Sequence, residues 1–428
     1  MSVGVIQIGQ CGNQIGYNIF TNLINEMKKS SECLTQIIFD TYFTISDNNK
    51  LYANSLLIDM EAKVIEKCIK NAKNCGWNYF MENVIHKQSG SGNNWANGFF
   101  NHGPTVENKF VETLSTFTEK FDFLDSVIII NSLAGGTGSG LGSYIAILLK
   151  DYFPEINLFN IAVWPHNSGE VVVNSYNTLL SISENYKVSD LMTIIHNQDI
   201  FDICKDIYNI KKIGFENLNS VISKHVINMM VPPLGESTNE VRAKPFQLYS
   251  YISELIYYLG MNPKLKFNRI ISTPEVPYEN LKFTNNTWLS LCKRGTQMMR
   301  NKSNESKIDW TNNHTISNNS VVSIYRGRSL NEIPNEDENV FTKYCIENNV
   351  KYKEYKDVNS INSYEKHFTV LSNSNYYCDD IKRTLMKAYE MFEYNAFIHQ
   401  YEKYGLEKQD FIEAFAFCEQ INYDYTSA

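Results

Sequence analysis

Short apolar runs alternate with longer stretches of helical periodicity in the first half of the chain. Buried strands are predicted at Val3–Ile8, Ser126–Asn131, Leu158–Trp164 and Leu191–His196. Helices are predicted at Gln14–Lys28, Leu141–Tyr152 and Val173–Asn185. Strands that alternate with helices indicate an α/β fold with a mostly parallel sheet covered on both faces.

The second half is more mixed. Long helices are predicted at Phe215–Met230, which Pro232 and Pro233 end, and at Phe246–Leu259. Strands are predicted at Lys266–Ile271, Val321–Tyr325 and His367–Leu371, and the chain is helical from Cys378 to its end with a break at Gly405. The polar stretches Leu234–Lys244 and Asn301–Asn319 read as loops, the second a mobile surface loop. We expect three parts, residues 1–214, 215–375 and 376–428.

Composition narrows the class of protein. The chain has 428 residues, 43% of them hydrophobic and 20% charged, which is typical of a globular protein of two or three domains. The net charge of −8 argues against a nucleic-acid partner held by its phosphates. Nine cysteines without a CxxC pair predict free thiols in a reducing compartment. Without a basic leader or an apolar run of about 18 residues, we expect a cytosolic or nuclear protein without membrane contact.

The stretch Ala134–Gly140 is rich in glycine and joins a predicted strand to a predicted helix. Glycines let backbone N–H groups converge on an anion, and the helix dipole favours negative charge at the same place. Thr137 and Ser139 add hydroxyl donors. The loop has no lysine and is not a Walker A motif, so phosphate charge there would be balanced by amides, the dipole and Mg²⁺. The alternative is a flexible glycine turn.

A second glycine-rich turn, Gly9–Gly16, follows the first predicted strand. Alone, such a turn could belong to a nicotinamide-dependent oxidoreductase. It lacks the GxGxxG order and the acidic residue about 20 residues further on that this class requires. The oxidoreductase stays the weakest alternative.

Taken together, the two turns resemble the tubulin superfamily. Four further segments resemble its loops and its outer helix pair: Leu57–Glu61, Asn93–Ala96, Ala396–Tyr401 and Gly405–Phe411. The resemblance implies a tubulin-like fold, in which a parallel-sheet GTPase domain is followed by a central helix, a mixed α/β intermediate domain and C-terminal helices. It also implies bound GTP and Mg²⁺.

The resemblance implies a role for particular residues. Glu61 corresponds to the acidic group near the metal, and Asn197 and Asn219 to the residues that contact guanine. Phe215 takes the place of a tyrosine that stacks on the base, and Asn174 stands where the family more often has an acid. The full set of implied cofactor residues is Gln10, Cys11, Gln14, Asn93, Ala134, Gly135, Gly136, Thr137, Gly138, Ser139, Glu170, Asn174, Asn197, Phe215 and Asn219.

Tubulins hydrolyse nucleotide in trans, with an acid on a helix of the next subunit. Glu254 in the predicted helix Phe246–Leu259 aligns with that acid. A second acid of α-tubulin is replaced by Tyr251. The chain could therefore be an assembly-stimulated GTPase that uses Glu254, or a structural subunit that binds GTP without turnover, with Glu254 a solvated helix residue.

Finer details resemble the delta branch of the family. These are Ala134 before two glycines, the segments Val163–Pro165 and Tyr401–Gly405, and last residues that are poor in glutamate. This resemblance implies other tubulins, microtubules and centriolar proteins as partners. It further implies a cytoskeletal protein of the centriole or basal body that supports triplet microtubules and cilium or flagellum assembly. An epsilon-like or other divergent tubulin is the alternative.

Overall fold

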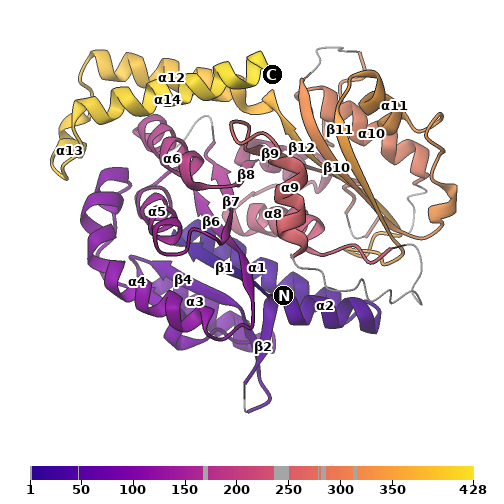
Figure 1. Cartoon of the computed structure of the whole chain (residues 1–428), viewed down its shortest axis with the longest axis horizontal. Helices are drawn as coiled ribbons and strands as arrows, with labels where there is room; N and C mark the ends of the chain where they lie inside the picture. The colour runs from indigo at the N-terminus through magenta and orange to yellow at the C-terminus, as the bar shows by residue number, and fades with distance from the viewer. Residues whose placement is uncertain are drawn as a thin grey trace.

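One mixed β-sheet runs through the whole chain. A computed structural model describes residues 2–46, 48–166, 172–235, 250–277, 279–280, 286–311 and 316–428. Ten strands form this sheet in the order β11-β10-β12-β9-β8-β7-β6-β1-β4-β5 (Figure 1). Their bounds are β1 Ser2–Ile8, β4 Ser55–Asp59, β5 Val84–His86, β6 Leu124–Ser132, β7 Asn157–Trp164, β8 Leu191–His196, β9 Phe267–Thr273, β10 Asn318–Gly327, β11 Lys351–Asp357 and β12 Lys366–Ser374. Two short strands, β2 Phe43–Ile45 and β3 Leu51–Ala53, pair separately.

Along the part of the sheet with the order β9-β8-β7-β6-β1-β4-β5, each pair of neighbouring strands is parallel, and the predicted parallel sheet is confirmed. Beyond β9 the sheet becomes mixed, because β12 is antiparallel to both β9 and β10. The strand pairing between the two halves is short, and it joins β8 to β9 through Met192 with Phe267 and Thr193 with Asn268. The sheet therefore continues across the predicted boundary at residue 214, and that boundary remains a prediction.

Helices cover both faces of the sheet (Figure 1). Their bounds are α1 Gly9–Met27, α2 Glu32–Tyr42, α3 Ala62–Asn74, α4 Gly103–Thr118, α5 Gly142–Tyr152, α6 Asn174–Val188, α7 Asn197–Asp202, α8 Phe215–Met230, α9 Tyr251–Leu259, α10 Trp288–Arg300, α11 Val340–Glu347, α12 Cys378–Glu393, α13 Ile398–Glu402 and α14 Lys408–Ser427. The C-terminal helices α12 and α14 lie against each other and against α6. Within the described residues, none of these helices is long and apolar enough to span a bilayer.

Alternate residues of the central strands face opposite layers, which is why both layers can be apolar. In β1, Val3 and Val5 join the core formed with α1, α3 and α8. Ile6 and Ile8 of the same strand join the core beneath α4 and α5. The period of two in a strand buried on both faces explains the continuous apolar run in the sequence.

The structure corrects the prediction at Gly9–Gly16. This segment is the first two turns of α1, not a loop before a helix that begins at Gln14. Gly9 supplies the turn out of β1 with φ of +72°. Inside the helix, a Cβ at Gly12 would lie 2.1 Å from the Ile130 carbonyl oxygen, so this glycine allows α1 to approach β6 closely.

The stretch Asn301–Asn319 is also less exposed than predicted. Ser303 is buried, and the Glu305 side chain is 7% exposed. Asn318 and Asn319 belong to β10. Residues 312–315 and most of the predicted loop Leu234–Lys244 lie outside the described residues.

Strand β11 was not predicted at all. Its sequence, Lys351–Asp357, has lysine and tyrosine where a central strand has aliphatic residues. It lies at the edge of the sheet, where charged residues discourage further pairing.

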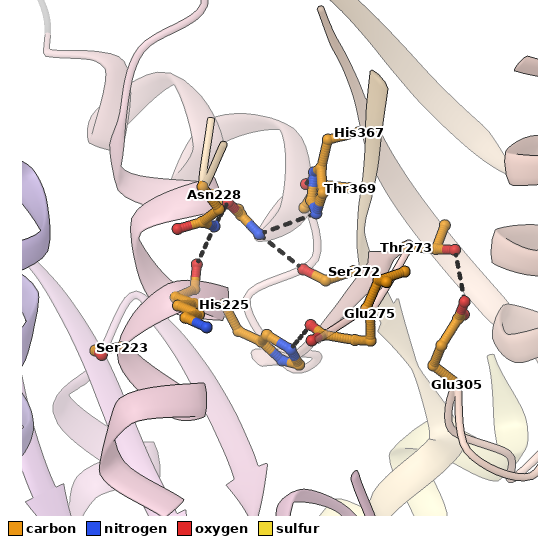
Figure 2. Close-up of polar contacts among 12 residues, drawn as sticks. Ser223, His225, Asn228, Ser272, Thr273, Glu275, Glu305, His367 and Thr369 are labelled. Atoms are coloured by element: carbon orange, nitrogen blue, oxygen red, sulfur yellow. Dashed lines mark hydrogen bonds and ion pairs between the residues drawn. The ribbon is translucent and has the colours of Figure 1, made fainter. Parts of the chain in front are cut away.

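A buried polar contact joins α8 to the second half of the sheet (Figure 2). His225 of α8 forms an ion pair with Glu275, which follows β9 and also accepts a hydrogen bond from the Tyr208 hydroxyl at 2.8 Å. One turn further on, Asn228 donates to the Ser272 hydroxyl at 3.0 Å and lies 3.3 Å from His367 Nε2. Polar contacts at these positions fix the register between helix and sheet.

Candidate nucleotide site

A cavity of about 680 Å³ opens at the carboxyl ends of the parallel strands. This is the edge where open α/β sheets bind ligands, and the volume suits a molecule of nucleotide size. Of the predicted cofactor and metal residues that the structure describes, all line it except Ser139. Those that do are Gln10, Cys11, Gln14, Glu61, Asn93, Ala134, Gly135, Gly136, Thr137, Gly138, Asn174, Asn197, Phe215 and Asn219.

Two segments pack backbone to backbone along one wall of the cavity: residues 91–98 and the glycine-rich loop Ala134–Gly140. A Cβ at Gly98 would lie 2.2 Å from the Gly136 carbonyl oxygen, and one at Gly140 would lie 2.0 Å from the Trp95 carbonyl oxygen. The hydroxyls of Ser91 and Thr137 are 2.8 Å apart and close the contact. The glycines of Ala134–Gly140 therefore allow this loop to pack against residues 91–98, as well as to approach a ligand.

The first turns of two helices meet beneath the cavity. The helical turn Thr137–Leu141, which leads into α5, lies against the start of α1, since a Cβ at Gly9 would be 2.9 Å from the Gly138 nitrogen. The Asn13 amide donates to the carbonyls of Gly9 at 2.9 Å and Ile58 at 3.1 Å, which ties α1 to the end of β4. Free N–H groups and the dipoles of both helices favour an anion here.

Two carboxylates lie on the cavity wall at the end of β4. Asp59 is buried, and burial raises the pKa of its carboxyl to about 6. Its Oδ1 accepts from the Met60 N–H at 2.8 Å, while Oδ2 has no hydrogen-bond partner among the described residues. Glu61 follows at the N-cap of α3 and is exposed. An unpartnered buried carboxylate oxygen beside a second carboxylate fits a hard cation such as Mg²⁺, which keeps several waters or phosphate oxygens as further ligands.

The opposite wall is built by α8 and α7. Asn219 is buried and donates to the Gln14 side chain at 3.0 Å, so its amide is fixed at the wall. Phe215 at the start of α8 is 60% exposed, so packing in the core does not account for its ring. Asn197 begins α7, and Asn174 begins α6.

Several predicted residues need separate comment. Ser139 is buried, and its hydroxyl donates to the Gly135 carbonyl, so it shapes the loop instead of facing the cavity. Burial raises the pKa of the Cys11 thiol to about 12, which makes it a neutral part of the wall. Glu170 lies outside the described residues. Glu254 lies in α9, away from the cavity, and half-buried beside Tyr355.

The sequence reasoning missed other residues of the wall. They are Asp59, Val64, Ser91, Gly92, Ser132, Pro165, His166, Gln198 and Phe201. Asp59 and Ser91 each stand two positions before a predicted residue, so a wider reading of the same motifs could have found them. Phe201 and His166 come from separate segments and meet only in the fold, with ring centroids 5.7 Å apart.

The described wall contains no lysine or arginine. Phosphate charge must then be met by backbone N–H groups, helix dipoles and a cation held by the two carboxylates. Fold and cavity together define a nucleotide-binding α/β protein of the open-sheet type.

The chain belongs to the tubulin family. Residues 2–205 match the Tubulin/FtsZ family, GTPase domain, which implies that the protein binds GTP. The tubulin delta chain of Mus musculus is 31% identical, over 100% of this chain and 99% of that protein. The delta chain of Homo sapiens is also 31% identical, over 99% of both chains. The tubulin beta-1 chain of Colletotrichum gloeosporioides is 27% identical, over 96% of this chain and 91% of that protein. The family match leaves the oxidoreductase alternative without support.

Proposed function

We propose that the cavity holds GTP with Mg²⁺, as the predicted site residues anticipate. The observation that supports this most is the convergence of those residues, from segments spread between Gln10 and Asn219, on one cavity. The phosphates would lie on Ala134–Gly138 and the start of α1, and the base between Phe215, Asn197 and Asn219. When bound, Mg²⁺ supplies positive charge to the phosphates, and Asp59 and Glu61 are the residues that would hold it.

The test of this assignment is to measure guanine nucleotide in the purified protein. We expect guanine nucleotide in the acid extract by HPLC, and affinity for added GTP that increases with Mg²⁺. Asp59→Asn removes the ionised carboxylate and should abolish most of the Mg²⁺ dependence while leaving metal-free binding close to wild type. In the wild type, the Mg²⁺ dependence should fall below pH 6, because protonation of Asp59 competes with the metal. The absence of nucleotide from the extract, together with a lack of affinity for added GTP, would contradict the assignment.

We further propose that the protein acts as a delta-type tubulin. Identity of 31% to delta chains over the full length, against 27% to a beta-1 chain, supports this. In that role it would support triplet microtubules of centrioles or basal bodies, and so cilium or flagellum assembly. Its partners would be other tubulins, microtubules and centriolar proteins.

Localisation with co-purification tests this second proposal. The tagged chain should concentrate at basal bodies in a ciliated or flagellated cell and co-purify with other tubulins. Its depletion should replace triplet with doublet microtubules in cross-section. A uniform cytoplasmic distribution together with intact triplets after depletion would contradict the proposal.

For turnover of the nucleotide, we propose Glu254 as the group that acts on a neighbouring subunit. Its position on α9 is half-buried, so part of the side chain is open to contact by a second chain. Glu254→Ala should lower phosphate release only where release rises with protein concentration, and GTP affinity should stay unchanged. Equal release by Glu254→Ala and wild type would identify a GTP-binder without this chemistry.

A further inference from the structure

One buried amide contacts the backbone of the cavity loop at two points. Asn177 of α6 is 0% exposed. Its Nδ2 donates to the Asn93 carbonyl at 2.8 Å, and its Oδ1 accepts from the Trp95 N–H at 3.0 Å. Asn93 lines the cavity, whereas Asn177 lies behind the loop and does not. The same side chain therefore fixes the peptide groups on both sides of Asn94.

The backbone of this loop takes an uncommon conformation beside the cavity. Asn93 has φ of +52° and Gly92 has φ of +58°, so two successive residues lie in the left-handed region. Asparagine adopts this conformation more readily than most residues, and the two hydrogen bonds of Asn177 to the adjoining peptide groups help to hold Asn93 in it. The Asn93 side chain faces the glycine-rich loop Ala134–Gly140, as its Oδ1 would be 3.8 Å from a Cβ at Gly135. A small movement of the Asn93 carbonyl would change what this side chain offers to a ligand.

The support continues to the C-terminal helices. The buried Tyr401 hydroxyl of α13 donates to the same Asn177 Oδ1 at 2.7 Å. Beside it, the Asn94 amide donates to the Gln400 carbonyl at 3.2 Å. Residues more than 300 positions later in the chain thus hold the cavity loop from its outer side.

Only an amide can satisfy this site. The position requires one donor for the Asn93 carbonyl and one acceptor for two donors, the Trp95 N–H and the Tyr401 hydroxyl. A carboxylate keeps the acceptor but places a negative charge next to the Asn93 carbonyl, and an aliphatic residue satisfies none of the three groups.

We propose that Asn177 is the positioning residue of the cavity loop around Asn93 and that it couples the position of α13 to nucleotide affinity. This inference rests on the proposed binding of GTP in the cavity. Because coupling is reciprocal, a partner that displaces α13 would weaken nucleotide binding, and bound nucleotide would hold α13 in place.

The experiment compares two asparagines of one helix. Asn185 of α6 is also 0% exposed, and its amide contacts Ser143, Ser181 and Asn160, none of which lines the cavity. It reaches the loop only indirectly, through the Ser143 hydroxyl and the Trp95 indole, and not through the loop backbone. Asn177→Asp and Asn185→Asp therefore make the same chemical change at equal burial. Binding of a fluorescent GTP analogue, its dissociation rate, and the melting temperature without nucleotide are measured for each variant.

We expect Asn177→Asp to weaken binding about tenfold, mainly through faster dissociation, which corresponds to loss of one or two buried hydrogen bonds. Asn185→Asp should stay within about twofold of the wild type, whatever its melting temperature. Tyr401→Phe removes a single hydroxyl and should weaken binding about threefold, which tests the link to α13 even if Asn177→Asp does not fold.

Equal loss of affinity in Asn177→Asp and Asn185→Asp would reduce Asn177 to a stabilising residue and overturn the proposal. Wild-type affinity in Asn177→Asp would overturn it too, and wild-type affinity in Tyr401→Phe would by itself overturn the coupling to α13. A wild-type protein that fails to bind the analogue would instead overturn the proposed nucleotide site itself, and this inference with it.

Discussion

Two buried acids, Asp59 and Glu305, have raised pKa values that the sequence alone does not reveal. Asp59 lies on the cavity wall, where its raised pKa and its oxygen without a hydrogen-bond partner are consistent with a site for a metal ion. Glu305 follows α10 in the chain and lies between the Thr273 hydroxyl at 3.1 Å and Arg294 at 3.3 Å. Burial raises the pKa of Glu305 from 4.5 to about 7. A ligand in the cavity would account for the burial of Asp59, whereas the burial of ionised Glu305 lowers the stability of the fold.

That cost predicts a stabilising substitution. The folded protein favours protonated Glu305, so its contribution to stability is fully present below pH 4.5 and is lost as the pH rises through about 7. Glu305→Gln keeps an acceptor for Thr273 and Arg294 and removes the charge. Above pH 8 it should raise the free energy of unfolding by up to about 3 kcal/mol, and below pH 4.5 it should change little. Thermal melting across this range measures the effect, and equal pH slopes for variant and wild type would contradict it.

Among the elements, α8 connects the two parts of the molecule. Its first residues line the cavity, and His225 and Asn228 contact the second half of the sheet (Figure 2). Burial alone would raise the pKa of Glu275, but the charge of His225 and the hydrogen bonds from His225 and Tyr208 hold the pKa of this carboxyl below its usual value. The helix is thus held to the turn after β9 by a buried ion pair.

Removal of one partner from this pair should be costly. His225→Gln or Glu275→Gln leaves a buried group without its partner, and each should lower stability by about 3 kcal/mol. The double variant should lose less than the sum of the two, because no lone charge remains. Since the pKa of Glu275 is lowered, the pair contributes above pH 4.5 and is lost as the pH falls through the folded value. Urea denaturation at pH 7 and pH 4 measures both effects, and strict additivity would contradict a direct pair.

For the whole molecule, the continuous sheet and the C-terminal helices place distant segments around one cavity. The C-terminal residues Gln400 and Tyr401 support a loop near residue 93, although the family match itself covers residues 2–205. Nucleotide binding should therefore protect α13 as well as the cavity loops. Hydrogen exchange with and without GTP measures this, and unchanged exchange in α13 beside slowed exchange in residues 91–98 would contradict it.

Much of the fold and the site could be predicted because it is encoded locally. The predicted limits of α8 agree with the structure, since apolar residues recur at helical spacing until Pro232 follows. Most predicted cavity residues were those that the resemblance to tubulins implied, and the two glycine-rich segments among them follow β1 and β6, whose carboxyl ends lie at one edge of the sheet. Strand β11 was missed because an edge strand needs no apolar run.

The sequence by itself determined the central strands β1, β6, β7 and β8, several of the long helices, the glycine-rich segments and the family resemblance, because each depends on residues close together in the chain. Only the tertiary structure decided that Gly12 serves helix packing, that Asp59 and Glu305 are desolvated, and that Asn177 joins the cavity loop to Tyr401. These properties depend on which surfaces the folded chain brings together and which water it removes, and neither is written in the local pattern.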